Sequence, residues 1–225
     1  MIVLAIDTVA NLCAACIYDS AEARELGRAV RAIGKGHAEV LMDVISEALA
    51  AAGLAMKDVG AVAVATGPGS FTGIRVGVSV ARGLSLALGV PSAGIGTLEA
   101  LAFEARETTG AQPVLAAIDG GRDGIYAAVY DQFGKVGYAP AVIDLEKIAK
   151  LAGHVGLLVG SAARRIAAEL ASGAKVGSEL PTADIGIYAR LAIAHGFTAE
   201  KPRPLYLRAP DAKPQSHFAL PRKSP

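Results

Sequence analysis

The sequence predicts an α/β protein made of two related halves, each built on its own mixed sheet. Three observations support this prediction. Short β-favouring runs alternate with amphipathic helical segments along the chain. A fifteen-residue segment of the first half returns in the second half. The chain has 225 residues, of which 52% are hydrophobic, so it is long enough for two small domains and apolar enough to bury their cores.

The first half begins with three predicted strands. Residues 2–7 and 12–18 are apolar runs around a polar break, which is typical of a β-hairpin. Residues 25–33 are interpreted as the third strand, although a helix fits their composition almost as well. Residues 37–52 have apolar side chains at three-and-four spacing and are followed by Gly53, which predicts an amphipathic helix. A buried strand, a glycine-rich loop, a helix and a short strand follow at 61–65, 66–72, 73–88 and 90–93.

The second half repeats the opening of the first. Residues 5–19 align without gaps on residues 117–131, and six of the fifteen positions are identical, among them Asp7 and Asp119. Apolar strands share few residue types, so chance likeness of two hairpins is the alternative, but the similarity favours an internal duplication. Two strands and three helices are then predicted at 135–142, 145–151, 155–159, 162–171 and 183–194.

This repetition predicts subdomains at residues 1–110 and 111–208, the second of them reduced in size. The segment from Glu200 onward holds six of the eleven prolines and six Lys or Arg residues against two acids. Residues 209–225 are therefore expected to be a flexible basic tail until bound. Residues 204–208, Pro-Leu-Tyr-Leu-Arg, are interpreted as a pinned strand before that tail.

Composition limits the location and the partners of the chain. Its 22 Lys and Arg against 21 Asp and Glu give a net charge of +1, without the basic excess of proteins that hold nucleic acid by charge alone. The N-terminal apolar run ends at Asp7, and the uncharged stretch between Arg82 and Glu99 is too short and too interrupted to span a membrane. A cytoplasmic protein without membrane contact is expected, with Cys13 and Cys16 buried and reduced.

Each half carries an aspartate at the first turn of its hairpin. Paired hairpin turns of this kind resemble the phosphate-binding turns of actin-like and sugar-kinase-like ATPases, where the aspartate organises Mg²⁺ and glycines admit the phosphate. The first turn, residues 7–11, has no glycine, whereas the second, residues 119–123, has two glycines and a second acid. Asp7, Thr8 and Asp119 are therefore interpreted as vestigial phosphate turns.

The glycine-rich segment 66–75 follows a predicted strand and opens a predicted helix. Free N–H groups and the helix dipole favour anions at such a place, so Gly69 and Ser70 are further candidate phosphate-binding residues. The segment lacks the Gly-Lys-Ser/Thr ending of a P-loop, and its glycine spacing differs from the dinucleotide fingerprint. No histidine lies three or four residues from another, so no helix presents a paired metal site.

A stripe of small residues runs along the helix that follows this segment. Its members recur every four residues and allow another backbone to approach closely. Spacing alone leaves two interpretations open, namely packing against the chain's own sheet and docking of a partner. The stripe consists of Gly73, Gly77, Ala81 and Ser85.

Four motifs resemble those of the TsaB (YeaZ) family. They are the long and specific segment 66–77, the opening residues 5–8, residues 37–39 and residues 204–208. The resemblance implies a duplicated actin-like (ASKHA, ribonuclease H-like) fold. It also implies a non-catalytic subunit required to form N6-threonylcarbamoyladenosine in tRNA. The implied partners are the related catalytic subunit TsaD, the ATPase TsaE and, through the complex, tRNA.

The resemblance also implies where chemistry is missing and where the partner docks. The catalytic relative holds its metal on two histidines, and Thr97 and Leu101 stand at the matching positions here, so we expect no catalytic site and no metal. We expect no cofactor on the isolated chain, and ATP with Mg²⁺ only in the complex. The partner would dock on the two helices of the first half, which favours the docking interpretation of the stripe, and the free chain would pair with itself as a homodimer through the same face. The expected interface residues are His37, Leu41, Val44, Gly73, Arg75, Val76, Gly77, Val80 and Ala81.

Two other functions remain as alternatives from the sequence. The first is an ATP-dependent phosphotransferase of the sugar or acyl kinase class that uses Asp7 and Asp119 around Mg-ATP. The second is a peptidase, for which the sequence offers no recognisable nucleophile or metal site.

Overall fold

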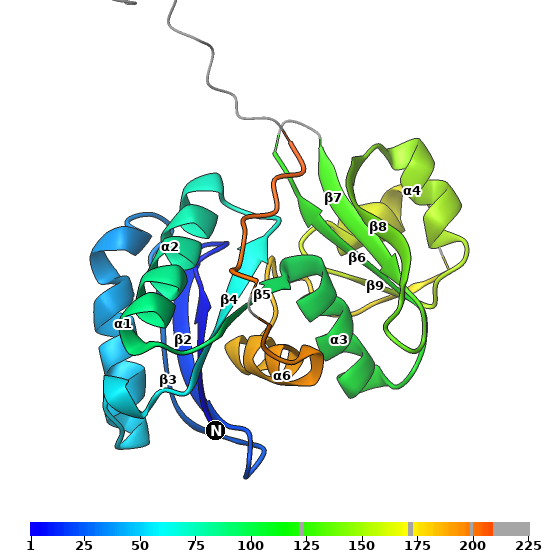
Figure 1. Ribbon diagram of the computed structural model, residues 1–225. Coiled ribbons are helices and arrows are strands. Elements are labelled where there is room, and N and C mark those ends of the chain that lie inside the picture. Colours follow the sequence, from blue (N-terminus) through cyan, green and yellow to red (C-terminus); the bar gives the residue numbers. More distant parts are fainter. Residues whose placement is uncertain (122–123, 171–172, 199, 209–225) are drawn as a thin grey trace, which may run out of the picture.

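The computed structural model describes residues 1–121, 124–170, 173–198 and 200–208 (Figure 1). Within these ranges the chain forms two five-stranded sheets, with strand orders β3-β2-β1-β4-β5 and β10-β9-β6-β7-β8. Each sheet combines antiparallel and parallel pairs, so the predicted α/β class with two mixed-sheet halves is confirmed. The predicted basic tail, residues 209–225, lies outside the described residues.

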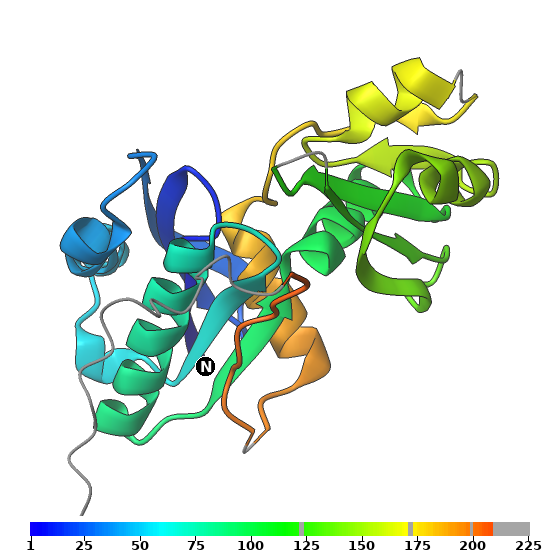
Figure 2. The same cartoon turned by 90° about the horizontal axis from the view of Figure 1, so that it is seen from above.

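The first sheet begins with an antiparallel hairpin and continues with parallel strands. Its central strands are apolar on both sides because helices cover both faces of the sheet. Two helices, α1 and α2, cover one face, and α6 covers the other (Figures 1 and 2). The strands are Ile2–Asp7 (β1), Leu12–Asp19 (β2), Arg24–Ala32 (β3), Ala61–Gly67 (β4) and Ser92–Gly96 (β5). The helices are His37–Ala52 (α1), Phe71–Leu88 (α2) and Ile185–His195 (α6), with a short 3-10 turn at Met56–Asp58.

The second sheet repeats this order with shorter elements. Its hairpin strands β6 and β7 pair antiparallel as β1 and β2 do, and an aspartate ends the first strand in each case, but Asp119 pairs with Ile125, one residue short of the equivalent of Ala14, the partner of Asp7. The strands are Val114–Asp119 (β6), Ile125–Tyr130 (β7), Val136–Ile143 (β8), Leu157–Val159 (β9) and Lys175–Val176 (β10). The helices are Thr97–Thr109 (α3), Leu145–Ala152 (α4) and Ala163–Leu170 (α5).

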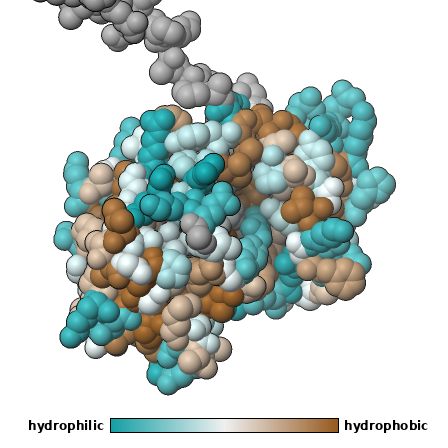
Figure 3. Space-filling view, in the orientation of Figure 1, coloured by the Kyte–Doolittle hydropathy of each residue, from teal (hydrophilic) through white to brown (hydrophobic). Residues whose placement is uncertain are grey.

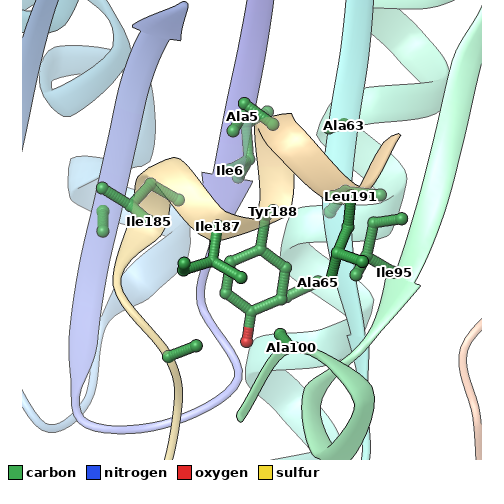
Figure 4. Close-up of a cluster of buried hydrophobic side chains, with 14 of the residues drawn as sticks. Ala5, Ile6, Ala63, Ala65, Ile95, Ala100, Ile185, Ile187, Tyr188 and Leu191 are labelled. Atoms are coloured by element: carbon green, nitrogen blue, oxygen red, sulfur yellow. The ribbon is translucent and has the colours of Figure 1, made fainter. Parts of the chain in front are cut away.

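Two helices pack on the sheet of the opposite half, across the predicted subdomain boundary between residues 110 and 111. Helix α3 belongs to the first half of the sequence but packs mainly on β6 and β7, whereas α6 belongs to the second half and packs on β1, β2, β4 and β5. Figure 4 shows Tyr188 and Leu191 of α6 among buried residues of the first sheet, including Ala5 and Ile95. One hydrophobic core therefore continues from α1 through α6 and α3 to the second sheet. A smaller core lies beneath α4 and α5.

Most predicted elements are present, and the differences are local. The predicted bounds of β1 and α1 agree with the structure, and the segment predicted at 25–33 is a strand rather than a helix, with bounds Arg24–Ala32. Helix α3 was not predicted, and residues 204–208 are not a strand, although Leu205 N–H donates to the carbonyl of Thr66 at 2.8 Å. One described helix, α2, is long and apolar enough to cross a membrane, but it carries two arginines and packs along β4.

Candidate functional site

The first hairpin turn holds Asp7 in a buried polar chain. The carboxylate of Asp7 is 2% exposed and accepts hydrogen bonds from the N–H of Val9 at 2.9 Å and from the hydroxyl of Thr182 at 2.6 Å. The oxygen of Thr182 in turn lies 2.6 Å from the hydroxyl of Tyr188. Burial raises the pKa of Asp7, and the hydrogen bond from Thr182 partly opposes that shift. Asp7 therefore ties β1 to the segment that leads into α6, and both of its oxygens are already engaged.

The glycine-rich segment lies directly on this first turn. The hydroxyl of Thr8 donates to the carbonyl of Gly73 at 2.7 Å, and the N–H of Ser70 donates to the carbonyl of Val9 at 2.6 Å. A Cβ atom at Gly69 or Gly73 would overlap the backbone of Val9 or Thr8. The absence of a side chain at Gly69 and Gly73 therefore lets the loop pack directly on the first hairpin turn. The loop itself fills the space over Thr8 that a phosphate would need.

The stripe of small residues on α2 faces the chain's own sheet. A Cβ atom at Gly77 would lie 2.5 Å from Oγ1 of Thr8 and 3.4 Å from a methyl group of Val64. Gly73 and Ala81 are buried on the same side of the helix. This packing corrects the interpretation of the stripe as a docking face.

Three of the expected interface residues on α1 are buried as well. Leu41 and Val44 are fully buried in the core, and Nε2 of His37 lies 3.1 Å from the carbonyl of Leu12. The apolar side of an amphipathic helix packs on the sheet beneath it. The apolar spacing in α1 therefore identified the side that faces the sheet, and these three residues do not lie on the outer surface. Of the nine expected residues, the exposed Arg75 and the partly buried Val76 and Val80 reach the surface.

The second hairpin turn is engaged by two arginines. Asp119 is about half exposed and forms an ion pair with Arg165 at 3.1 Å. The guanidinium group of Arg208 donates to the carbonyls of Gly120 and Gly121 at 3.4 and 3.2 Å. The carboxylate and the carbonyls of this turn are therefore already paired with cations of the chain itself.

The two hairpin turns meet at one cleft. Of the five predicted phosphate-turn residues, Gly69, Ser70 and Asp119 line this cleft of about 440 Å³, and Asp7 and Thr8 do not. Other lining residues include Val9, Asn11, Gly120 and Tyr126. The buried Thr8 instead packs beneath Gly73 and Gly77.

The described residues contain no group of three His, Cys, Asp or Glu side chains placed to hold a metal ion. Thr97 and Leu101, at the positions compared with metal ligands, are fully buried at the start of α3. Cys13 and Cys16 are also buried, as predicted, and desolvation raises the pKa of Cys13 to about 11.

The outer side of α1 and α2 presents apolar side chains to solvent. Met42 on α1 and Phe71 and Leu86 on α2 are 45%, 38% and 76% exposed. Together with Val76 and Val80 they form what we name the α1–α2 face. Figure 3 shows brown, apolar surface over the region where these helices lie in Figure 1. The sequence analysis did not identify Met42, Phe71 or Leu86 as interface residues. They could have been found as apolar residues that lie outside the three-and-four spacing of the buried side of each helix.

Arg75 marks the N-terminal end of the α1–α2 face. Its guanidinium group lies 3.7 Å from the centre of the Phe71 ring, and its Nε donates to the hydroxyl of Tyr206 at 2.8 Å. The rings of Phe71 and Tyr206 are 5.0 Å apart. Exposed clusters of aromatic residues and arginine are common at protein interfaces.

Comparison with known proteins relates this fold to one family. A family model described as "TsaD: tRNA N6-adenosine threonylcarbamoyltransferase" matches residues 30–200. The chain is 33% identical over 132 residues to the tRNA threonylcarbamoyladenosine biosynthesis protein TsaB of Escherichia coli, across 59% of this chain and 56% of that protein. YeaZ from Pseudomonas aeruginosa superposes with a TM-score of 0.74 at 29% identity, over 92% of this chain and 99% of that one. The chain belongs to the TsaB (YeaZ) family.

Two further relatives match nearly the whole chain. A second Pseudomonas aeruginosa structure, titled as an uncharacterized protein with similarity to peptidase YeaZ, superposes with a TM-score of 0.78 at 30% identity, over 92% of this chain and 99% of that one. An uncharacterized protein of Mycobacterium tuberculosis is 35% identical over 94% of both chains. The chain spans about half the length of the curated TsaB relatives that it matches. The predicted duplicated α/β fold with two mixed sheets is confirmed, and it is the fold of the YeaZ structures.

Proposed function

We propose that this chain is a non-catalytic subunit in the biosynthesis of tRNA N6-threonylcarbamoyladenosine, and that it binds a related TsaD-type chain. The observation that carries this proposal is the α1–α2 face, where Met42, Phe71 and Leu86 expose apolar surface on two adjacent helices. A partner that presents a similar helix pair would bury these side chains in a four-helix interface. The family names of its relatives supply the pathway.

The state of the two hairpin turns supports a binding role over catalysis. In the first turn, Gly69 and Gly73 lie against the backbone of Val9 and Thr8, and the aspartate of the second turn is paired with Arg165. A kinase of this fold would need the same positions for phosphate and Mg²⁺. We therefore propose that the isolated chain uses no cofactor and that ATP with Mg²⁺ acts in the complex.

The wider assembly belongs to the same proposal. A TsaE-type ATPase and tRNA would join once the two related chains have paired, because a net charge of +1 gives this chain little attraction for RNA by itself. Without the partner, the apolar α1–α2 face would pair with a second copy of the chain. A cytoplasmic location is part of the proposal, because the proposed substrate is tRNA.

The proposal is tested by mixing the purified chain with its TsaD homologue and measuring complex formation and threonylcarbamoyl transfer. We expect transfer by the mixture and little transfer by either protein alone. Leu86→Glu should weaken binding at least about tenfold, which corresponds to about 1.4 kcal/mol, because the interface would bury an unpaired carboxylate.

Phe133→Glu provides the matched control for this test. Phe133 is 83% exposed, but it lies between β7 and β8 in the second half, so its replacement should leave binding unchanged. Equal binding by the Leu86→Glu variant would reject the α1–α2 face as the docking surface. Full transfer by the homologue without this chain would reject the functional proposal as a whole.

A further inference from the structure

Residues 202–208, here named the clasp segment, cross from one half of the molecule to the other. In Figure 1 this segment rises beside α2 and β4 and ends near the turn that joins β6 to β7. Residues 204–208 of this segment are one of the four motifs of the sequence analysis. Neither the sheets nor the proposed docking gives this motif as a whole a role. The contacts of the clasp segment with both halves give that motif a mechanical function.

The first half holds the clasp segment at three places. Pro202 packs against Gly94 of β5, where an added Cβ would lie 3.1 Å from the proline ring. The N–H of Leu205 donates to the carbonyl of Thr66 at 2.8 Å. The hydroxyl of Tyr206 accepts a hydrogen bond of 2.8 Å from Nε of Arg75. The segment is therefore fixed along the end of β4 and the start of α2.

The second half holds the clasp segment through Arg208. Its guanidinium group donates to the carbonyls of Gly120 and Gly121, and it also lies against Gly124, where any side chain would overlap it. Hydrogen bonds from a charged donor are stronger than those between neutral groups. Both bonds come from Nη1 of Arg208, so a single nitrogen holds two carbonyls of one turn.

The position of these contacts relates the clasp segment to the cleft. Gly120, which Arg208 holds, lines the cleft opposite Gly69 and Ser70. Thr66, whose carbonyl accepts from Leu205, is the penultimate residue of β4, and the loop that carries Gly69 begins after Gly67. The clasp segment thus connects the two walls of the cleft directly, through Leu205 on one side and Arg208 on the other.

We propose that the clasp segment holds the two hairpin turns at a fixed separation, so that the cleft keeps its width without a bound ligand. The proposal concerns the isolated chain and does not depend on the proposed docking. Its key residue is Arg208, because this side chain makes the contacts of the segment with the second half. Tyr206 and Leu205 anchor the other end.

The test measures the separation of the two halves by spin labels in the full chain. The exposed Ala50 of α1 and Ala168 of α5 are replaced by cysteine, while the native cysteines are buried and remain unlabelled. We expect one narrow distance distribution for this protein. Arg208→Gln should shift the distribution to longer distances and remove the single narrow peak.

Arg203→Gln serves as the control in the same segment. Arg203 is exposed and faces Glu200 at 3.9 Å, so its replacement should leave the distribution unchanged. If Arg208→Gln does not fold by circular dichroism, Arg208→Lys and Tyr206→Phe replace it, and both should broaden the distribution. A native distance distribution in the folded Arg208 variant, or in both replacement variants, would overturn the proposal.

Discussion

The hydroxyl group of Thr182 donates a 2.6 Å hydrogen bond to the carboxylate of Asp7, although 175 positions separate these residues in the sequence. Both side chains are buried, and Tyr188 lies next in the same polar chain. Since Asp7 ends β1 and Tyr188 belongs to α6, this series of hydrogen bonds joins the first strand to the last described helix. The aspartate that resembles a magnesium ligand in the sequence is thus part of the packing of the molecule.

Thr182→Val should lower the free energy of unfolding by about 1–3 kcal/mol, because the carboxylate of Asp7 and the hydroxyl of Tyr188 both lose a buried partner. Urea denaturation measures this change. Thr182→Ser keeps the hydroxyl and serves as the control, with a smaller effect. Equal stability of the valine and serine variants would contradict a structural role for the hydrogen bond.

The titration of Asp7 should affect stability with a defined sign. Because burial raises its pKa above 3.8, the folded state holds the proton of Asp7 more tightly than the unfolded state does. This stabilisation is fully present below the unfolded pKa and is lost as the pH rises through the folded pKa. Asp7→Asn lacks this titration, so the native protein should lose stability relative to the variant as the pH rises above 3.8. Denaturation of both proteins over a pH series provides the measurement, and a difference independent of pH would reject the raised pKa.

Gly73→Ala should destabilise the protein by about 1–3 kcal/mol, because the new methyl group would overlap the carbonyl of Thr8 and a backbone group cannot move aside. Gly83 lies on the same helix with open space around its Cβ position, so Gly83→Ala should stabilise the protein by about 0.5–1 kcal/mol. Thermal unfolding of the two variants compares them directly. Changes of the same sign would mean that Thr8 does not restrict Gly73.

Mg-ATP should leave the thermal unfolding temperature of the isolated chain unchanged. The reason is that the loop from Gly69 to Gly73 fills the space over Thr8, and Arg165 is paired with Asp119. A ligand that binds the folded state would raise that temperature. A rise with Mg-ATP that disappears in Asp119→Ala would support the kinase alternative and contradict this expectation.

Much of the fold follows from local sequence signals. The apolar spacing from Leu41 to Leu49 and the left-handed Gly53 define α1, and the repeat of Asp7 at Asp119 identifies the two hairpins. Helix α3 had a comparable signal in Leu98, Leu101 and Ala105, which lie at three-and-four spacing before Gly110.

The candidate site was harder to predict, because spacing does not tell which neighbour a face meets. The stripe of Gly73, Gly77 and Ala81 does mark a closely packed surface, but its neighbours are Thr8 and Val64 of the chain's own first sheet and hairpin turn. Likewise, the contact between Thr182 and Asp7 depends on how the two halves are arranged in space. Such relationships come from tertiary packing, which no local pattern contains.

The exchange of α3 and α6 between the halves bears on how the chain is made. When the ribosome has released the first sheet, the side of β1 and β4 that Ile187, Tyr188 and Leu191 will cover is still bare. A nascent chain with such exposed apolar strands is prone to aggregate, and its folding must wait for distant residues. Dividing the gene between codons 110 and 111 would therefore give two fragments that each lack a helix of their own core, in spite of the repeat in the sequence.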